Sequence, residues 1–176
     1  MQLISDEYRK LNKQLHEERK EYGNNGADYL DYVVSLIKQL KTHDILDYGC
    51  GKGALQNNLP FKIHQYDPAI EKFAELPKPA QIVICTDVIE HIEPEYLDAV
   101  LKHIKEVTLK YCYMVIATTE AQKTLPDGRN AHLIVKDYKW WINKLFENFD
   151  ILNFQHYRNR VGFVLQPNDL PNKDLN

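Results

Sequence analysis

Short apolar runs alternate with amphipathic helical segments along most of this chain, and this order constrains the fold more than any other feature. The runs predict strands at 44–48, 62–66, 81–85, 111–117, 150–156 and 161–166. Apolar residues that recur every three or four positions predict helices at about 94–110, with Pro94 in the first turn, and at about 137–148. Because strands that alternate with helices form a mainly parallel sheet covered on both faces, we predict an α/β fold with a doubly wound sheet of about six or seven strands.

The two ends of the chain depart from this alternation. No helix separates the last two predicted strands, so the last strand is expected to run antiparallel. Two helices are predicted before the first strand, at 3–21 and 28–40. The length of 176 residues fits one domain. The expected division is a helical cap at 1–40, a core at 44–166 and a flexible tail at 167–176.

Composition narrows the class of protein and of partner. The chain has 22 Lys and Arg against 25 Asp and Glu, a formal net charge of −3, so a small-molecule substrate is expected rather than nucleic acid. Its three cysteines lack the Cys-x-x-Cys spacing of zinc sites. No run approaches the roughly 18 apolar residues of a membrane span. We expect a cytoplasmic protein without membrane contact, whose oligomeric state the sequence does not indicate.

The first predicted strand leads directly into a glycine-rich turn, Asp47-x-Gly49-x-Gly51-x-Gly53. Glycine lets the backbone approach a nucleotide-like ligand, because no side chain intervenes. The spacing differs from the Gly-x-Gly-x-x-Gly of dinucleotide sites, and Asp47 stands where those sites usually hold an apolar residue. A carboxylate in this position suits a cationic part of the ligand better than a pyrophosphate.

A second carboxylate, Asp67, ends the next predicted strand, 20 residues after Asp47. At this point of an α/β sheet a carboxylate can accept hydrogen bonds from both ribose hydroxyls of a nucleoside. The alternative is a structural turn formed with Pro68. Ligands of such sheets bind beyond the carboxyl ends of the strands. The two motifs together predict a pocket for a nucleoside with a positively charged tail.

These motifs, with Cys85-Thr86-Asp87-Val88-Ile89-Glu90-His91-Ile92, resemble those of class I S-adenosylmethionine-dependent methyltransferases over about residues 44–166. The resemblance implies a Rossmann-like methyltransferase fold. It also implies transfer of the sulfonium methyl group to an O or N nucleophile of a small-molecule acceptor. The implied cofactor-binding residues are Asp47 near the methionine ammonium, Asp67 at the ribose, Asp87, and the turn residues Gly49, Cys50, Gly51 and Gly53.

The chain departs from the family pattern in one element. Many of these enzymes have another strand between the ribose carboxylate and the segment that begins at Cys85, and that strand ends in an acidic residue facing the adenine. Only residues 68–80, with Pro77 and Pro79, are available here. We therefore expect this strand to be short or absent.

The Asp87-x-x-Glu90-His91 segment and the later His132 resemble a metal-dependent subset of the family. Small-RNA 2′-O-methyltransferases and ubiquinone-pathway O-methyltransferases use Glu-x-x-Glu-His, the former with a later His, to hold a divalent metal. By this resemblance Asp87, Glu90, His91 and His132 are the metal ligands, and Glu90, His91 and His132 the catalytic residues. The alternative is a metal-free loop in which His91 or His132 is the general base.

Other functions fit parts of the sequence. A NAD(P)-dependent oxidoreductase would have a similar fold, but the glycine spacing and Asp47 argue against it. A non-catalytic S-adenosylmethionine-binding module is compatible with the shortened crossover. RNA methylation is disfavoured by the negative net charge.

The remaining polar and aromatic side chains receive simpler predictions. His16 and His103 are expected on charged helix surfaces, and Arg160 as a solvated charge of the last turn. The N-terminal residues Tyr8 and Tyr22 are candidates to frame a substrate pocket. The N-terminal helices are expected either to cap the active site or simply to pack.

Overall fold

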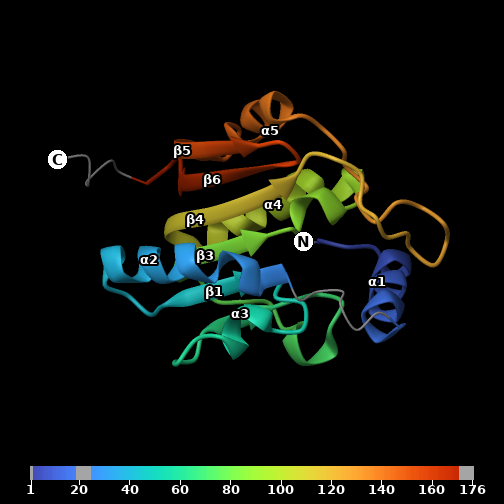
Figure 1. Ribbon diagram of the computed structural model, residues 1–176, viewed down its shortest axis with the longest axis horizontal. Coiled ribbons are helices and arrows are strands. Elements are labelled where there is room, and N and C mark those ends of the chain that lie inside the picture. The colour runs from blue at the N-terminus through green and yellow to red at the C-terminus, as the bar shows by residue number, and fades with distance from the viewer. Residues whose placement is uncertain (1, 19–24, 171–176) are drawn as a thin grey trace.

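The computed structural model describes residues 2–18 and 25–170, which form a six-stranded sheet with helices on both faces (Figure 1). The strand order is β2-β1-β3-β4-β6-β5. Strands β2, β1, β3 and β4 are parallel, and β6 is antiparallel to both of its neighbours. The predicted fold class, strand number and antiparallel last strand are confirmed.

The elements follow one another much as the pattern predicts. The strands are β1 (Ile45–Tyr48), β2 (His64–Tyr66), β3 (Ala80–Thr86), β4 (Thr108–Ala117), β5 (Phe149–Tyr157) and β6 (Arg160–Pro167). The helices are α1 (Asp6–Glu18), α2 (Leu30–Leu40), α3 (Ala54–Asn57), α4 (Leu97–Val107) and α5 (Tyr138–Leu145). Short 3₁₀ turns are η1 (Asn25–Tyr29), η2 (Glu71–Phe73), η3 (Ile89–His91) and η4 (Pro94–Tyr96). None of the helices in the described ranges is long and apolar enough to span a membrane.

Several helix boundaries differ from the prediction by a few residues, and two of the differences have a clear cause. Helix α1 begins at Asp6 rather than residue 3, since the Ser5 hydroxyl caps it by accepting a hydrogen bond from the Tyr8 amide (3.0 Å). Helix α4 ends at Val107 rather than residue 110. The β-branched Thr108 already belongs to β4, where it pairs with Ala80.

The sheet is buried on both faces by two separate apolar clusters. Helices α4 and α5 cover one face, where Leu101, Trp141 and Phe163 are fully buried. Helix α2 and the short α3 cover the other, through Val33 and Leu55. A parallel sheet requires this double cover, because both faces of its strands are apolar.

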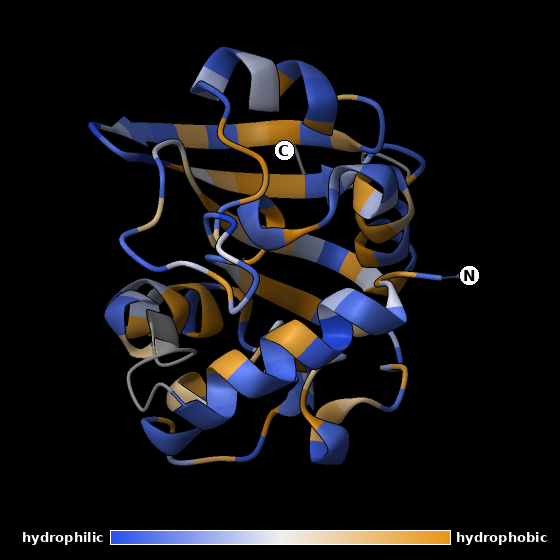
Figure 2. Cartoon of the chain, turned by 90° about the vertical axis from the view of Figure 1, so that its right-hand side faces the viewer, coloured by the Kyte–Doolittle hydropathy of each residue, from blue (hydrophilic) through white to orange (hydrophobic). Residues whose placement is uncertain are grey.

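Helix α1 belongs to neither layer. It lies across the carboxyl ends of the parallel strands, at the right of Figure 1, and its apolar stripe is visible in Figure 2. That stripe packs on Leu125 and Leu133 of the 118–136 loop. The Ser5 hydroxyl and amide also donate hydrogen bonds to Glu93 (2.6 and 2.9 Å). The helix and the loop together cover the edge of the sheet where ligands are expected.

The segment between β2 and β3 contains no strand. Residues 68–79 hold only the 3₁₀ turn η2 before β3 begins at Ala80, and β2 is an edge strand of the sheet. The predicted loss of this strand is confirmed.

Candidate active site

A cavity of about 530 Å³ lies between α1 and the carboxyl ends of β1, β2 and β3. Its volume is in the range of small-molecule binding sites. Most of the predicted site residues line it, namely Asp47, Gly49, Cys50, Gly51, Asp67, Asp87, His91 and His132. Gly53 and Glu90 are not among its lining residues.

The glycine turn is tied to the end of β2. The amides of Gly49 and Cys50 both donate to the carbonyl oxygen of Tyr66 (2.7 and 3.0 Å). Gly49 has a φ of +77°, and a Cβ there would lie 2.4 Å from Val88 Cγ2. Both the left-handed backbone and the close approach of the β3 loop therefore require glycine at this position. Gly53 precedes α3 and faces Gln65, so a direct cofactor contact by Gly53 stays a prediction.

Asp67 connects the two motifs that were predicted to bind a nucleoside. Its carboxylate accepts hydrogen bonds from the amides of Gly51 (3.0 Å) and Ala69 (2.9 Å). Burial raises its pKa, while these two amides oppose the rise. The bond from Ala69 is the Asx turn that was the structural alternative. Each carboxylate oxygen has two lone pairs, so the turn leaves acceptor capacity for ribose hydroxyls, and that role stays a prediction.

Asp47 is a buried carboxylate at the end of β1. It is 5% exposed. Burial, followed by the negative charge of Asp67, raises its pKa to about 7. A carboxylate in this environment is stabilised by a cation that enters the cavity.

Asp87 adopts a left-handed backbone conformation, with a φ of +54°. Its carboxylate accepts a hydrogen bond from the Tyr29 hydroxyl (3.0 and 3.1 Å to its two oxygens). Arg160 Nη1 donates to the same hydroxyl at 2.8 Å. Strained non-glycine residues of this kind are concentrated at functional sites, and the cofactor-binding role of Asp87 stays a prediction.

Sequence reasoning missed Tyr29 and wrongly predicted Arg160 to be a solvated turn charge. Arg160 is the first residue of β6 and pairs with Ala117, so the strand register sets its position. It lies next to η1 and lines the cavity. No local pattern carries this information, because 131 positions separate Arg160 from Tyr29.

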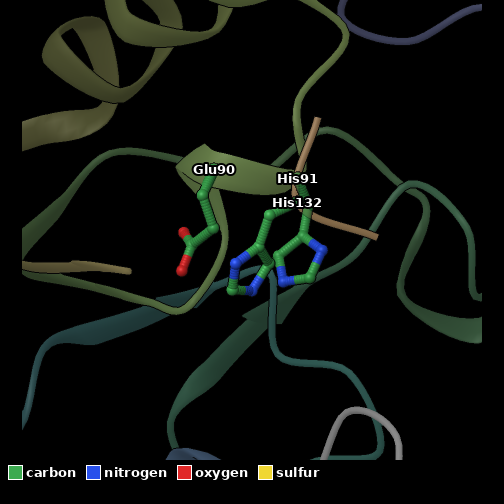
Figure 3. A group of neighbouring side chains, drawn as sticks. All are labelled: Glu90, His91 and His132. Carbon is green, nitrogen blue, oxygen red and sulfur yellow. The ribbon is translucent and has the colours of Figure 1, made fainter. Parts of the chain in front are cut away.

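Three of the four predicted metal ligands lie together. One ligand atom each from Glu90, His91 and His132 lies within 4.8 Å of the other two (Figure 3). Asp87 is not part of this group, and its carboxylate is hydrogen-bonded to Tyr29 instead. The structure therefore brings together a carboxylate and two imidazoles.

The hydrogen bonds of this group direct its ligand atoms. The carbonyl oxygens of Ala131 and Thr119 accept from Nδ1 of His91 (2.8 Å) and of His132 (2.6 Å), which places the lone pair of each ring on Nε2. Glu90 Oε1 accepts from the Ala117 amide (2.8 Å).

The charges of the group are set by burial. Oε2 of the fully buried Glu90 has no hydrogen-bond partner within the described chain. Burial and then the charge of Asp87 raise the pKa of Glu90 to about 8. Burial and then His132 lower the pKa of His91 to about 3, so its ring is neutral at pH 7. At pH 7 Glu90 is therefore mostly protonated, and its Oε2 lies beside a neutral imidazole.

Two histidines lie elsewhere than predicted. His16, expected on a surface, projects from α1 into the cavity, where burial and then Lys52 lower its pKa to about 4. It shares one helix face with Tyr8, which lines the cavity as predicted. His103 is buried, with Nδ1 2.8 Å from the Tyr48 hydroxyl. The eight-residue spacing from Tyr8 was the available signal for His16. Tyr22 lies outside the described residues.

Comparisons with known proteins identify the family. The family described as "Methyltransferase domain" matches residues 7–166. A search of curated proteins finds no significant match. Among solved structures, the fold resembles 1,6-didemethyltoxoflavin-N1-methyltransferase from Burkholderia thailandensis (TM-score 0.64, 12% identity, 96% of this chain and 93% of that chain).

Two further solved structures share the fold. One is magnesium protoporphyrin IX methyltransferase from Synechocystis PCC 6803 with bound SAH (TM-score 0.56, 17% identity, 80% of this chain and 83% of that chain). The other is the DhpI–SAH complex (TM-score 0.63, 14% identity, 93% of this chain and 98% of that chain). The family match argues against the oxidoreductase alternative. The chain belongs to the methyltransferase-domain family and has the class I fold of S-adenosylmethionine-dependent enzymes.

Proposed function

We propose that this enzyme transfers the methyl group of S-adenosylmethionine to an O or N nucleophile of a small molecule. One observation carries the proposal: Asp47, Asp67 and residues Gly49 to Gly51 of the glycine turn all line one cavity at the carboxyl ends of the parallel strands. The donor set fits the cofactor, with a buried carboxylate for an ammonium and a second for ribose hydroxyls. SAH or SAM is bound in several structures of this fold.

The residues of the chain act mainly by positioning. Asp47 holds the methionine ammonium, Asp67 the ribose, and Asp87 lines the cavity near the reacting groups, with the backbone of Gly49 to Gly51 beneath the cofactor. Holding donor and acceptor in line supplies most of the rate enhancement in such a transfer. Helix α1 and the 118–136 loop, which pack on one another, cover the cavity and limit the access of water to it.

A proton must leave the acceptor when an O–H or N–H group is methylated. His91, with a pKa of about 3, is a weak proton acceptor. His132, which directs Nε2 away from its bond to Thr119, is therefore the candidate general base. It lines the same cavity as Asp87 and Asp47.

A divalent metal is the second candidate component of this site. Carboxylate and imidazole donors suit Mn²⁺, Zn²⁺ or Mg²⁺. Two observations favour it: Oε2 of buried Glu90 has no hydrogen-bond partner among residues 2–18 and 25–170, and both histidines donate Nδ1–H to a backbone carbonyl, as metal ligands usually do. Glu90, His91 and His132 would hold the metal, whereas Asp87 would first have to release Tyr29. A bound metal lowers the pKa of a coordinated hydroxyl.

Calorimetric titration with S-adenosylmethionine and S-adenosylhomocysteine tests the cofactor site. Wild type should bind both at micromolar concentration, and Asp67→Ala should weaken binding at least about 30-fold, since a charged hydrogen-bonding group is lost. Asp98→Ala, which removes a surface carboxylate paired with Lys144, is the control and should bind like wild type. Absence of binding to the wild type would refute the proposal. Binding without turnover across a broad acceptor panel would support the non-catalytic alternative.

Manganese titration tests the metal separately. Mn²⁺ should bind the wild type, and Glu90→Gln and His132→Ala should each weaken that binding at least about tenfold. Arg129→Ala, which removes an exposed Arg129–Asp127 pair in the same loop, serves as the control. Full methyl transfer in excess EDTA would rule out a metal in the reaction and leave His132 as the base.

A further inference from the structure

A second cavity, of about 490 Å³, lies on the face of the sheet on which α2 packs. Strands β4 and β6 form its floor, and η1 with α2 faces β5 across it. We call it the tyrosine groove, after its lining residues Tyr29, Tyr32, Tyr113 and Tyr157. Its volume is that of a small-molecule site.

The floor of the tyrosine groove contains a glycine that the fold does not require. Gly162 lies within β6, between Val115 of β4 and Gln155 of β5. A Cβ at Gly162 would meet nothing closer than the Tyr113 hydroxyl at 3.7 Å, which is ordinary contact. Glycine weakens the interior of a strand, and its presence there often marks close approach of a ligand. Here the glycine backbone lines the groove, with the Tyr113 hydroxyl and Val115 as the nearest neighbours of a Cβ placed on it, at 3.7 and 3.8 Å.

The sides of the groove suit a flat ring. Tyr32 and Tyr113 are stacked, with centroids 4.2 Å apart and planes 25° apart, and Tyr29 meets Tyr113 edge-on at 6.5 Å. Tyr157 stands on the opposite side, 53% exposed. Aromatic side chains stack on planar ligands and offer their hydroxyls to polar ring substituents. The amide of Asn153 adds a donor and an acceptor on the same side.

The groove adjoins the cofactor cavity. Asn159 and Arg160 line both spaces. Arg160 donates to the Tyr29 hydroxyl, which in turn donates to Asp87 inside the cofactor cavity. One end of a ligand in the groove would therefore lie next to Arg160 and Tyr29, which are hydrogen-bonded to one another and, through Tyr29, to Asp87 of the cofactor cavity.

We propose that the tyrosine groove binds the non-reacting part of the methyl acceptor, and that the acceptor is a planar aromatic compound with a hydroxyl or amine nucleophile. The ring lies over Gly162 beside Tyr32 and Tyr113, and the nucleophile points past Arg160 toward the cofactor. This inference rests on the proposed methyl transfer, but binding in the groove can be measured without it.

The fluorescent phenol 2-naphthol and its saturated counterpart decahydro-2-naphthol are the probes. Direct titration without cofactor should show saturable binding of 2-naphthol, and binding of the saturated alcohol at least about tenfold weaker, because it cannot stack. The series Gly162→Ala, Gly162→Val and Gly162→Leu should weaken 2-naphthol binding in that order, to about tenfold or more for leucine, as the side chain fills the groove. Tyr157→Ala should also weaken it.

Two measurements separate a groove that binds ligand from a structural role of Gly162. The melting temperature should stay level or rise along the series, since the larger residues favour a strand. Binding of S-adenosylhomocysteine should stay within about twofold of wild type, because the substitutions lie outside its cavity. Lys110→Leu, which adds an apolar side chain at an exposed position of β4, is the matched control and should leave the affinities for 2-naphthol and for S-adenosylhomocysteine unchanged.

The outcomes are distinct. Equal binding of the two probes, or unchanged 2-naphthol binding in Gly162→Leu, overturns the inference while the cofactor proposal stands. Lack of S-adenosylhomocysteine binding by the wild type overturns the proposed function. Loss of 2-naphthol binding in Gly162→Leu with cofactor binding and stability retained supports the inference.

Discussion

The pH dependence of cofactor binding tests the role proposed for Asp47. Burial and the nearby charge of Asp67 raise the pKa of this carboxyl group to about 7. An ammonium group favours the ionised form, so binding must displace a proton wherever the free protein holds one. With a pKa of about 7, roughly 76% of Asp47 is ionised at pH 7.5 and roughly 9% at pH 6. We expect the dissociation constant to rise about eightfold over this interval, which is about 1.2 kcal/mol.

Calorimetry with S-adenosylhomocysteine measures this directly, because that ligand does not turn over. At pH 6 the wild type should release close to one proton on binding, which is read from the heats in two buffers of different ionisation enthalpy. Asp47→Asn should bind weakly, without this proton release and with little change between the two pH values. Asp98→Asn, on the surface of α4, should behave as wild type. Equal affinity of the wild type at both pH values, or the same pH dependence in Asp47→Asn, would refute the reasoning.

Three further perturbations follow from the same geometry. Gly49→Ala should abolish cofactor binding and lower the melting temperature by several degrees, whereas Gly128→Ala, which has positive φ but open space, should cost only about 1–2 kcal/mol in thermal unfolding. Ser5→Ala removes the α1 cap and its bond to Glu93, so proteolysis should cleave α1 faster while the core persists, and equal rates would contradict this. The raised pKa of Asp47 stabilises the fold fully below about pH 3.8, and this contribution is lost as the pH rises through about 7. The gain in the free energy of unfolding caused by Asp47→Asn should therefore grow from pH 4 to pH 8, by up to about 4 kcal/mol. Melting curves at the two pH values measure it, and a gain that stays constant would exclude a raised pKa of Asp47.

The sheet could be predicted from the sequence because its signals are local. Apolar runs, the glycine turn and the short final turn each occupy a few consecutive residues, and together they predict a mainly parallel sheet with an antiparallel last strand. The missing strand after Asp67 was predictable for the same reason, since 68–80 contains Pro77 and Pro79. Helix ends were predicted less well. The end of α4 depends on strand pairing between Thr108 and Ala80, which the sequence does not reveal.

The candidate site divides in the same way. Asp47, the glycine turn and Asp67 follow directly from two strand ends, so their convergence on one cavity was predictable. His132 reaches Glu90 and His91 only because the 118–136 loop folds back under α1. From the sequence, the three residues could be grouped only through the resemblance to metal-dependent methyltransferases. His16 was assigned to the surface because charges surround it in the sequence, whereas the cap buries that face of α1.

The two halves of the site therefore differ in how they are encoded, and the difference has a functional consequence. The cofactor side is built from contacts between adjacent strand ends, such as the bond from the Gly51 amide to Asp67, 16 positions apart. The proposed acceptor side depends on Tyr29 of η1 and on Asp87 and Arg160, which lie 58 and 131 positions after Tyr29, in the β3 loop and in β6. Substitutions in η1 or the final hairpin can thus reshape the tyrosine groove without disturbing the strand ends that hold the cofactor. We expect acceptor selectivity to change with residues such as Gly162 and Tyr157 while cofactor affinity is conserved, and a Gly162→Leu enzyme that lost both would show that the two halves are energetically one site.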